Sequence, residues 1–233
     1  MKLITLNTWG GKLYEDLIKF IEEKSKDVDV FCFQEVFDKG NSSREDTKGC
    51  RMNLYSEIKK VLQHFNSYIS LSQDGEHGIS IFIKNQIKVK NYGDFFVYRW
   101  KNAMINNDGY TMGKTFLYLQ FQKNTSKFII GNIWGLWSRW GKYDTPERIE
   151  QSEKIRKFLD KLEGKKILCG DFNLLPHTES LKILETDMRN LIKENNVQST
   201  RSHYYTKENK FADYILVSPD IKVKEFKVLN SVV

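Results

Sequence analysis

The segment Lys165-Lys166-Ile167-Leu168-Cys169-Gly170-Asp171-Phe172-Asn173 joins an apolar stretch to two polar side chains through a single glycine. Residues 165–169 predict a short strand, because their apolar run is bounded by charged and polar residues. Gly170 has no side chain, so it lets a neighbouring backbone or a substrate come close. The segment therefore predicts a buried strand that delivers Asp171 and Asn173 to a site at its end.

Two other predicted strands end in residues of the same kind. Residues 2–6 lead into Asn7, and residues 28–33 lead into Gln34-Glu35. The second of these strands is almost wholly apolar, which indicates burial on both faces. Functional side chains gather on loops that a rigid scaffold holds in place. Three strand ends with one chemistry therefore predict a shared polar site.

Carboxylate and amide oxygens indicate which cofactor such a site would take. They are hard ligands that suit Mg²⁺ or Mn²⁺ and are poor ligands for zinc or copper. Taken singly, each residue has a simpler interpretation. Glu35 could be a solvated strand end, Asp171 and Asn173 could form a turn, and Asn7 could cap a helix. Their common position at strand ends favours the metal site.

The composition indicates one globular domain. A chain of 233 residues with 40% hydrophobic and 13% aromatic residues can bury a large core. The charged fraction of 29% and the lack of a long apolar run favour a water-soluble protein without a membrane span. Neither a signal peptide nor a metal-binding cysteine spacing is evident, so we expect a cytoplasmic location. Cys32 and Cys169 lie in apolar runs and are expected in the core.

The net charge of +7 and the pI near 9.1 favour polyanionic partners such as nucleic acid or phosphorylated small molecules. Lysines are spread along the chain, so the charge alone does not separate a nucleic-acid partner from an ordinary basic surface. Residues 134–143 mix aromatic and basic side chains, including Trp134 and Arg139. This loop could stack bases and contact phosphates, or its tryptophans could pack it onto the fold.

Hydrophobic patterns place helices and strands along the chain without a repeat or a linker. A threonine cap followed by proline opens the longest predicted helix at Thr145-Pro146. Helices are predicted at residues 12–24, 54–65, 145–162 and 178–184. Further strands are predicted at residues 78–84, 88–97, 115–121, 128–133, 212–217 and 221–229, and a loop at 37–50. This arrangement suggests two stacked sheets flanked by helices.

The polar strand ends also resemble a known group of proteins. Asn7, Gln34-Glu35, Gly170–Asn173 and Asp213-Tyr214 follow one another as in the endonuclease/exonuclease/phosphatase superfamily, which includes deoxyribonuclease I-like nucleases and inositol-phosphate phosphatases. Residues 75–81 are similar to its glycine-led central strand, and other stretches resemble a compact bacterial branch. The resemblance implies an α/β, four-layer αββα sandwich of two mostly antiparallel sheets flanked by helices. It further implies one domain over the whole chain, with an incomplete C-terminus that lacks the last strand.

The resemblance implies roles for individual residues. Glu35 would bind Mg²⁺ or Mn²⁺, with Asn7 beside it. Asp171 would orient or deprotonate the attacking water, Asn173 would hold a phosphate oxygen, and Asp213 would support a histidine that binds the phosphate. The implied activity is metal-dependent hydrolysis of a phosphate ester by a phosphodiesterase, nuclease or phosphatase, with nucleic acid as one candidate substrate.

Two departures from the resemblance weaken the implied active site. Trp134 stands where members of the superfamily place a histidine, and an indole cannot titrate near neutral pH. The Ser-Asp-His motif expected after the last strand is absent, which leaves Asp213 without its expected partner. The sequence stops just before that motif, which favours a truncated sequence over a degenerate one.

These departures keep a second function open. A protein that lost both imidazoles would bind nucleic acid or a phosphate ligand on the same scaffold with impaired turnover. Trp134, Arg139 and His77 are the candidate substrate-binding residues in either case. The other three histidines are expected on the surface: His64, His177 and His203. No feature of the sequence indicates an oligomeric state.

Overall fold

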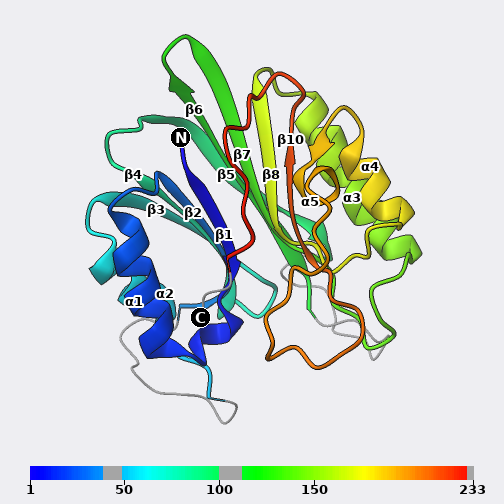
Figure 1. Cartoon of the computed structure of the whole chain (residues 1–233), viewed down its shortest axis with the longest axis horizontal. Helices are drawn as coiled ribbons and strands as arrows, with labels where there is room; N and C mark the ends of the chain where they lie inside the picture. The colour runs from blue at the N-terminus through cyan, green and yellow to red at the C-terminus, as the bar shows by residue number, and fades with distance from the viewer. Residues whose placement is uncertain (39–48, 100–111, 230–233) are drawn as a thin grey trace.

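Two β-sheets pack face to face, with helices on both outer sides, in the computed structural model of the chain (Figure 1). The structure describes residues 1–38, 49–99 and 112–229. One sheet has four strands and the other has six, and each combines parallel and antiparallel neighbours. The predicted sandwich of two mostly antiparallel sheets flanked by helices is confirmed.

The elements have the following bounds. Across the first sheet the strands are β1 (Leu3–Asn7), β2 (Val30–Phe37), β4 (His77–Lys84) and β3 (Phe65–Leu71). Across the second sheet they are β5 (Val89–Tyr98), β6 (Lys114–Lys123), β7 (Ser126–Trp134), β8 (Lys165–Asp171), β10 (Asp213–Val217) and β9 (Arg189–Asn190). The helices are η1 (Trp9–Gly11, a 3-10 turn), α1 (Tyr14–Ser25), α2 (Leu54–Val61), α3 (Pro146–Asp160), α4 (Glu179–Glu185) and α5 (Leu191–Glu194).

Two helices connect the parallel strand pairs. Strands β1 and β2 are parallel and are joined through α1, while β7 and β8 are parallel and are joined through α3. A parallel pair needs such a crossover, because the chain must return to the end of the sheet at which the first strand began. Helix α3 begins as predicted, with Pro146 in its first turn and the Thr145 side chain accepting a hydrogen bond from the Arg148 backbone. In Figure 1, α1 and α2 cover the first sheet, and α3 and α4 cover the second.

One predicted helix is too long. The pattern predicts a helix over residues 54–65, but α2 ends at Val61 and Phe65 opens strand β3, which was not predicted. Strand β3 pairs with β4 over its whole length, from Phe65 opposite Lys84 to Leu71 opposite Gly78. Tertiary pairing therefore decides the conformation of a segment whose own alternation is weak. The short elements β9 and α5 were not predicted either.

The strand predicted at residues 221–229 is wrong. These residues form neither helix nor strand, and they run beside β1 in Figure 1. Ile221, Val223 and Phe226 are partly buried and pack against the core between the sheets. Side-chain burial therefore holds this segment without a ladder of backbone hydrogen bonds. The loop predicted at 37–50 falls mostly on residues 39–48, which lie outside the described residues.

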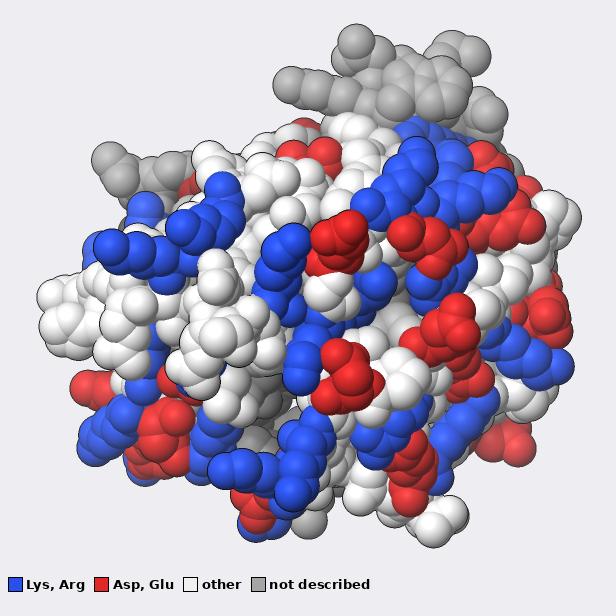
Figure 2. Space-filling model, turned by 90° about the horizontal axis from the view of Figure 1, so that it is seen from above, with Lys and Arg blue, Asp and Glu red and all other residues white. Residues whose placement is uncertain are grey.

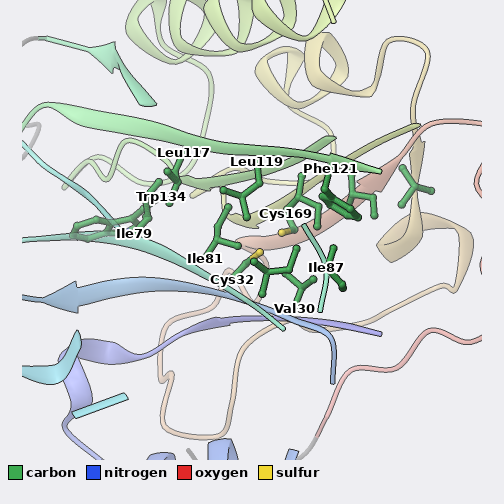
Figure 3. Packing of buried hydrophobic residues seen from close by; sticks show 14 of the residues in the cluster. Val30, Cys32, Ile79, Ile81, Ile87, Leu117, Leu119, Phe121, Trp134 and Cys169 are labelled. Atoms are coloured by element: carbon green, nitrogen blue, oxygen red, sulfur yellow. The ribbon is translucent and has the colours of Figure 1, made fainter. Parts of the chain in front are cut away.

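The main core fills the space between the sheets. It contains aliphatic and aromatic side chains from both sheets, together with Cys32 and Cys169, whose sulfur atoms face each other (Figure 3). All three cysteines are free, and these two are fully buried as predicted. Trp134 lies at one end of this cluster, near Ile79 and Leu117 (Figure 3). Along the described residues, no helix combines the length and apolar character that a bilayer crossing requires.

A buried pair of amides crosses from one sheet to the other. Gln34 on β2 donates from Nε2 to Asn132 Oδ1 on β7 at 2.7 Å. The Asn132 amide nitrogen donates in turn to the backbone oxygens of Phe33 and Ser80, both at 3.0 Å. Both amide side chains are fully buried. Because a buried polar group must find a partner, this network fixes how the first sheet is placed against the second.

Replacing Asn132 with alanine should destabilise the fold by about 3 kcal/mol, because Gln34 and two backbone oxygens would lose their buried partner. Urea denaturation measures this loss as a lower unfolding free energy at an unchanged slope. Gln86→Ala, in an exposed turn, is the matched control and should stay within about 0.5 kcal/mol of the starting protein. Equal effects of both substitutions would contradict the role of the amide pair.

Candidate active site

Three of the predicted strand ends meet between the two sheets. Asn7 ends β1, Glu35 lies on β2, and Asp171 ends β8 of the opposite sheet. The Asn7 amide nitrogen donates to Glu35 Oε1 at 2.8 Å and to Asp171 Oδ2 at 2.9 Å. All three residues line a cavity of about 970 Å³. The structure thus brings together the residues that the sequence singled out separately.

A β-bulge turns Glu35 toward this cavity. The pairing of β2 with β4 shifts register between Gln34 and Val36, and Glu35 adopts a left-handed backbone with φ of 58°. Bulges redirect a side chain locally and are common beside functional sites. The Thr8 hydroxyl contacts the backbone oxygens of Gln34 and Glu35 at 2.9 and 3.0 Å and so supports the bulge.

The backbone at the end of β8 is also fixed in an unusual conformation. Asn173 is also left-handed, with φ of 52°, and its backbone N–H donates to Asp171 Oδ1 at 3.0 Å. Its amide nitrogen donates to the backbone oxygen of Gly135 at 3.2 Å. Gly170 has φ of 136°, and a Cβ there would collide with the backbone oxygen of Ile133. The close approach predicted for this glycine is therefore one of backbone to backbone.

An arginine joins Asp171 to Asp213. Arg201 donates to Asp171 Oδ2 at 2.9 Å, and its Nε lies 3.6 Å from Asp213 Oδ2. The sequence leaves Asp213 without the histidine expected as its partner, and in the structure this guanidinium lies beside the carboxylate instead. Arg201 comes from the loop between α5 and β10, and Thr200 in the same loop accepts the Asp213 backbone N–H at 3.2 Å. The signal for Arg201 was the stretch Thr200-Arg201-Ser202, which resembles the bacterial branch but gave no role.

Two buried lysines complete the charged surroundings, and the sequence did not single them out. Lys142 donates to the backbone oxygen of Phe211 at 2.7 Å. Burial, assisted by the nearby Arg201, lowers the pKa of Lys142 to about 8. Lys114 opens β6, and burial lowers its pKa to about 7 against the pull of Glu35 and other carboxylates. Both lysines line the same cavity as Glu35.

The three acidic groups titrate differently because their surroundings differ. Burial raises the pKa of Glu35, and the Asn7 hydrogen bond only partly opposes this effect. Burial also acts on Asp171, but the Arg201 charge and the Asn7 hydrogen bond outweigh it and lower the pKa of that carboxyl. Burial raises the pKa of Asp213 to about 7 despite Arg201. Asp171 is therefore the carboxylate that the structure keeps ionised most firmly.

The predicted substrate-binding residues divide into two groups. Trp134 and His77 line the cavity, with their rings edge to face at 5.0 Å. The His77 Nδ1 atom also lies against the Asp74 carboxylate, and the ring stacks on Phe37 at 4.8 Å. Arg139 instead lies over the Trp140 ring at 4.5 Å and is not part of the cavity lining found among the described residues. The other three histidines are exposed, as predicted: His64, His177 and His203.

Exposed aromatic rings stand at the mouth of the cavity. Trp9 and Tyr204 are 45% and 44% exposed, and their ring centroids lie 6.3 Å apart. Trp9 has φ of 50°, a strained backbone for a bulky residue, and its N–H donates to Asn7 Oδ1 at 2.9 Å. The amide that holds both carboxylates therefore also fixes this ring beside them. In the 134–143 loop, Trp134 is packed inside, while Trp137, Trp140 and Tyr143 are exposed.

The oxygen donors of the site fit a hard divalent cation. Among the described residues, no cluster of three or more His, Cys, Asp or Glu side chains has the spacing of a protein-only metal cage. Mg²⁺ does not need such a cage, because it keeps several waters and binds through one or two carboxylates. Glu35 and Asp171 supply these carboxylates at one cavity wall. Asn7 points its amide nitrogen at them, so it positions the pair in this arrangement.

The fold and the site together define a class of protein: an α/β sandwich with carboxylates from opposite sheets at one cleft. Residues 4–233 match the Endonuclease/Exonuclease/phosphatase family, and the chain belongs to that family. Its members are hydrolytic phosphoesterases and nucleases that generally use divalent metals. No curated protein matches the chain in sequence.

Solved structures share this fold at low sequence identity. A mannosyl-6-phosphatase of Bacteroides thetaiotaomicron is 16% identical, with a TM-score of 0.69 over 94% of this chain and 85% of that one. A functionally unknown conserved protein of Enterococcus faecalis is 17% identical, with a TM-score of 0.69 over 94% and 87% of the two chains. The human Nocturnin catalytic domain is 16% identical, with a TM-score of 0.63 over 93% and 81%.

Replacing Arg201 with glutamine should lower the unfolding free energy at neutral pH by about 3 kcal/mol, because Asp171 would keep a buried charge without its cation. The pKa of Asp171 is lowered in the fold, so this loss should shrink as pH falls below about 4 and the carboxyl protonates. Denaturation series at several pH values measure both effects. Arg189→Gln breaks a surface pair with Glu194 and should cost at most about 1 kcal/mol.

Replacing Asp213 with asparagine should remove a titration from the stability profile. The pKa of Asp213 is raised from 3.8 to about 7, so its stabilising contribution is complete below pH 3.8 and is lost as pH rises to about 7. The unfolding free energy of the original protein, relative to Asp213→Asn, should therefore fall across this interval. Parallel stability curves for the two proteins would show that Asp213 titrates normally.

Proposed function

We propose that this protein hydrolyses a phosphate ester with the help of a bound divalent metal ion, Mg²⁺ or Mn²⁺. The observation that carries the proposal is the pairing of Glu35 and Asp171 through the single amide of Asn7, at the wall of a cleft between the sheets. Two adjacent carboxylates favour a cation, and the surrounding Arg201 and Lys142 favour an anionic substrate. A phosphate ester with its metal ion satisfies both requirements.

Each residue has a role consistent with its surroundings. Glu35 and Asp171 would hold the metal ion, which when bound would polarise a phosphoryl oxygen. Asp171 stays ionised and would orient the attacking water, since its lowered pKa makes it a weak proton acceptor. Asp213, with a pKa near 7, is the better match for accepting a proton at neutral pH. Asn173 lines the cavity with its amide fixed by Gly135 and would contact a phosphate oxygen.

The charge on one face of the molecule does not select the substrate. On the face seen in Figure 2, lysines and arginines alternate with aspartates and glutamates and do not merge into one basic patch. The charge on this face therefore gives no reason to favour nucleic acid over a small phosphate ester. A mannosyl-6-phosphatase shares the fold, so sugar phosphates belong among the test substrates. Nucleic acids and nucleotides belong there as well, because the family includes endonucleases and exonucleases.

A binding protein with impaired turnover is the second candidate. Trp134 supports it, because this buried ring cannot transfer a proton and occupies a position at the cavity. Two exposed rings, Trp9 and Tyr204, would suit the stacking of a planar ligand at the cavity mouth. Ligand affinity without turnover would favour this candidate, and it would leave the fold and the cleft unchanged.

Purified protein should hydrolyse at least one substrate of a panel that includes DNA, RNA, nucleotides, inositol phosphates and sugar phosphates. The reaction should require Mg²⁺ or Mn²⁺ and stop when EDTA is added. Asp171→Asn should lower kcat by about 10²- to 10⁴-fold, because it removes the charge that positions the water. Glu35→Gln should raise the metal concentration needed for half-maximal activity.

The control for these variants is Glu163→Gln, an exposed carboxylate that pairs with Lys127 on the surface. It should leave both kcat and the metal requirement unchanged. Circular dichroism should show that Asp171→Asn remains folded before its rate is compared. Turnover that persists in EDTA, or no turnover on any substrate of the panel, would overturn the proposed function.

A further inference from the structure

Lys114 is a buried cation whose ammonium group has no hydrogen-bonding partner within the described part of the chain. It opens β6, its side chain is among the most fully buried in the protein, and only 1% of the residue is exposed. Its ammonium nitrogen makes no hydrogen bond to any described residue. The residue nevertheless lines the cavity that contains Glu35 and Asp171. A buried ammonium in a cleft wall calls for a counter-charge, because burial without a partner is strongly unfavourable.

Aromatic packing accounts for the position of this ammonium group but does not supply the hydrogen-bond acceptors that it needs. Its Nζ lies 2.9 Å from the centroid of the Trp134 ring, and the His77 ring meets the same indole edge to face. A cation over an indole is attracted to the ring face, but this interaction accepts no directed hydrogen bond. The ring therefore holds the Lys114 nitrogen in place, while the N–H donors that point away from the ring still require acceptors.

The nearby carboxylates already have other partners. The charges of Glu35, Asp74 and Asp171 attract the ammonium but do not bond to it. Glu35 and Asp171 accept hydrogen bonds from Asn7, and Asp171 also accepts one from Arg201. The Asp74 carboxylate lies against His77 Nδ1. None of these carboxylates bonds to the ammonium in this arrangement, so its acceptor is left to a group that enters the cavity that Lys114 lines.

We propose that Lys114 contacts the anionic group of the ligand directly and donates hydrogen bonds to its phosphoryl oxygens. This inference rests on the proposed function, since it names the residue that receives the phosphate. Trp134 acts as the positioning residue for Lys114. The indole, which stands on β7 where the resemblance implies a histidine, lies against a cation on the neighbouring strand β6. Lys142 and Arg201 differ from Lys114, because both already donate to protein oxygens.

Inorganic phosphate is the probe that tests this contact without turnover. Its dissociation constant should be measured by calorimetry slightly below pH 7, where Lys114 carries its charge, once with excess Mg²⁺ and once with EDTA. Lys114→Met keeps the length of the side chain and removes the charge. It should weaken phosphate binding by about 10- to 100-fold, the value of one hydrogen bond to a charged group.

The matched control is Lys127→Met, which removes an exposed lysine paired with Glu163 at 3.2 Å. It should leave phosphate affinity unchanged. The inference is overturned if Lys114→Met binds phosphate as tightly as the original protein in both conditions. It is equally overturned if the original protein binds no phosphate in either condition.

Crystals of the unaltered protein soaked in phosphate keep the inference testable if Lys114→Met does not fold. A phosphate oxygen within about 3 Å of Lys114 Nζ would support the contact, and phosphate bound elsewhere in the cleft would exclude it. These measurements also separate the two proposals. Phosphate binding that depends on Lys114, without hydrolysis of any ester, would retain the contact and reject the enzyme. Metal-dependent hydrolysis with unchanged phosphate affinity in Lys114→Met would retain the enzyme and reject the contact.

Discussion

One amide group holds together two carboxylates that would otherwise repel each other. Asn7 donates to Glu35 from the first sheet and to Asp171 from the second, so the hydrogen bonds of a single side chain span the sandwich. Much of the local structure serves this arrangement. The bulge aims Glu35, Thr8 supports the bulge, and Gly170 lets β8 come close to β7. Without the amide, like charges would favour separation of the two strand ends.

Burial gives this site groups other than histidine that titrate near neutral pH. Of the four histidines, two line the cavity: His77, which lies against Asp74, and the exposed His203. The pKa values of Lys114 and Asp213 are shifted from opposite directions to about 7, in each case mainly by burial. A lysine and an aspartate can therefore both change charge near neutral pH, which unperturbed side chains other than histidine do not do.

The sequence was sufficient to single out the polar residues that stand at the end of an apolar strand. Asn7, Glu35 and Asp171 each come directly after or within an apolar run, which is a local signal, and their order allowed the sandwich to be predicted. Arg201 and Lys114 had no such signal. The chain contains 37 lysines and arginines, and only tertiary contacts decide which of them reach the site from a loop or from the start of a strand. For the same reason the helix predicted from residue 54 extends past Val61 to residue 65, and β3 was not predicted. Residues 221–229 were predicted as a strand, although they are held mainly by side-chain packing.

The long sequence separations in the cleft have a consequence for how the protein folds. The bond between Asn7 and Asp171 joins residues 164 positions apart, and the bond between Gln34 and Asn132 joins residues 98 apart. Closing such long loops is entropically costly, so contacts of this kind form late and slow the overall folding rate. Neither sheet alone contains both carboxylates. The cleft should therefore appear only in the last cooperative step, and a ligand that occupies it would report on complete folding.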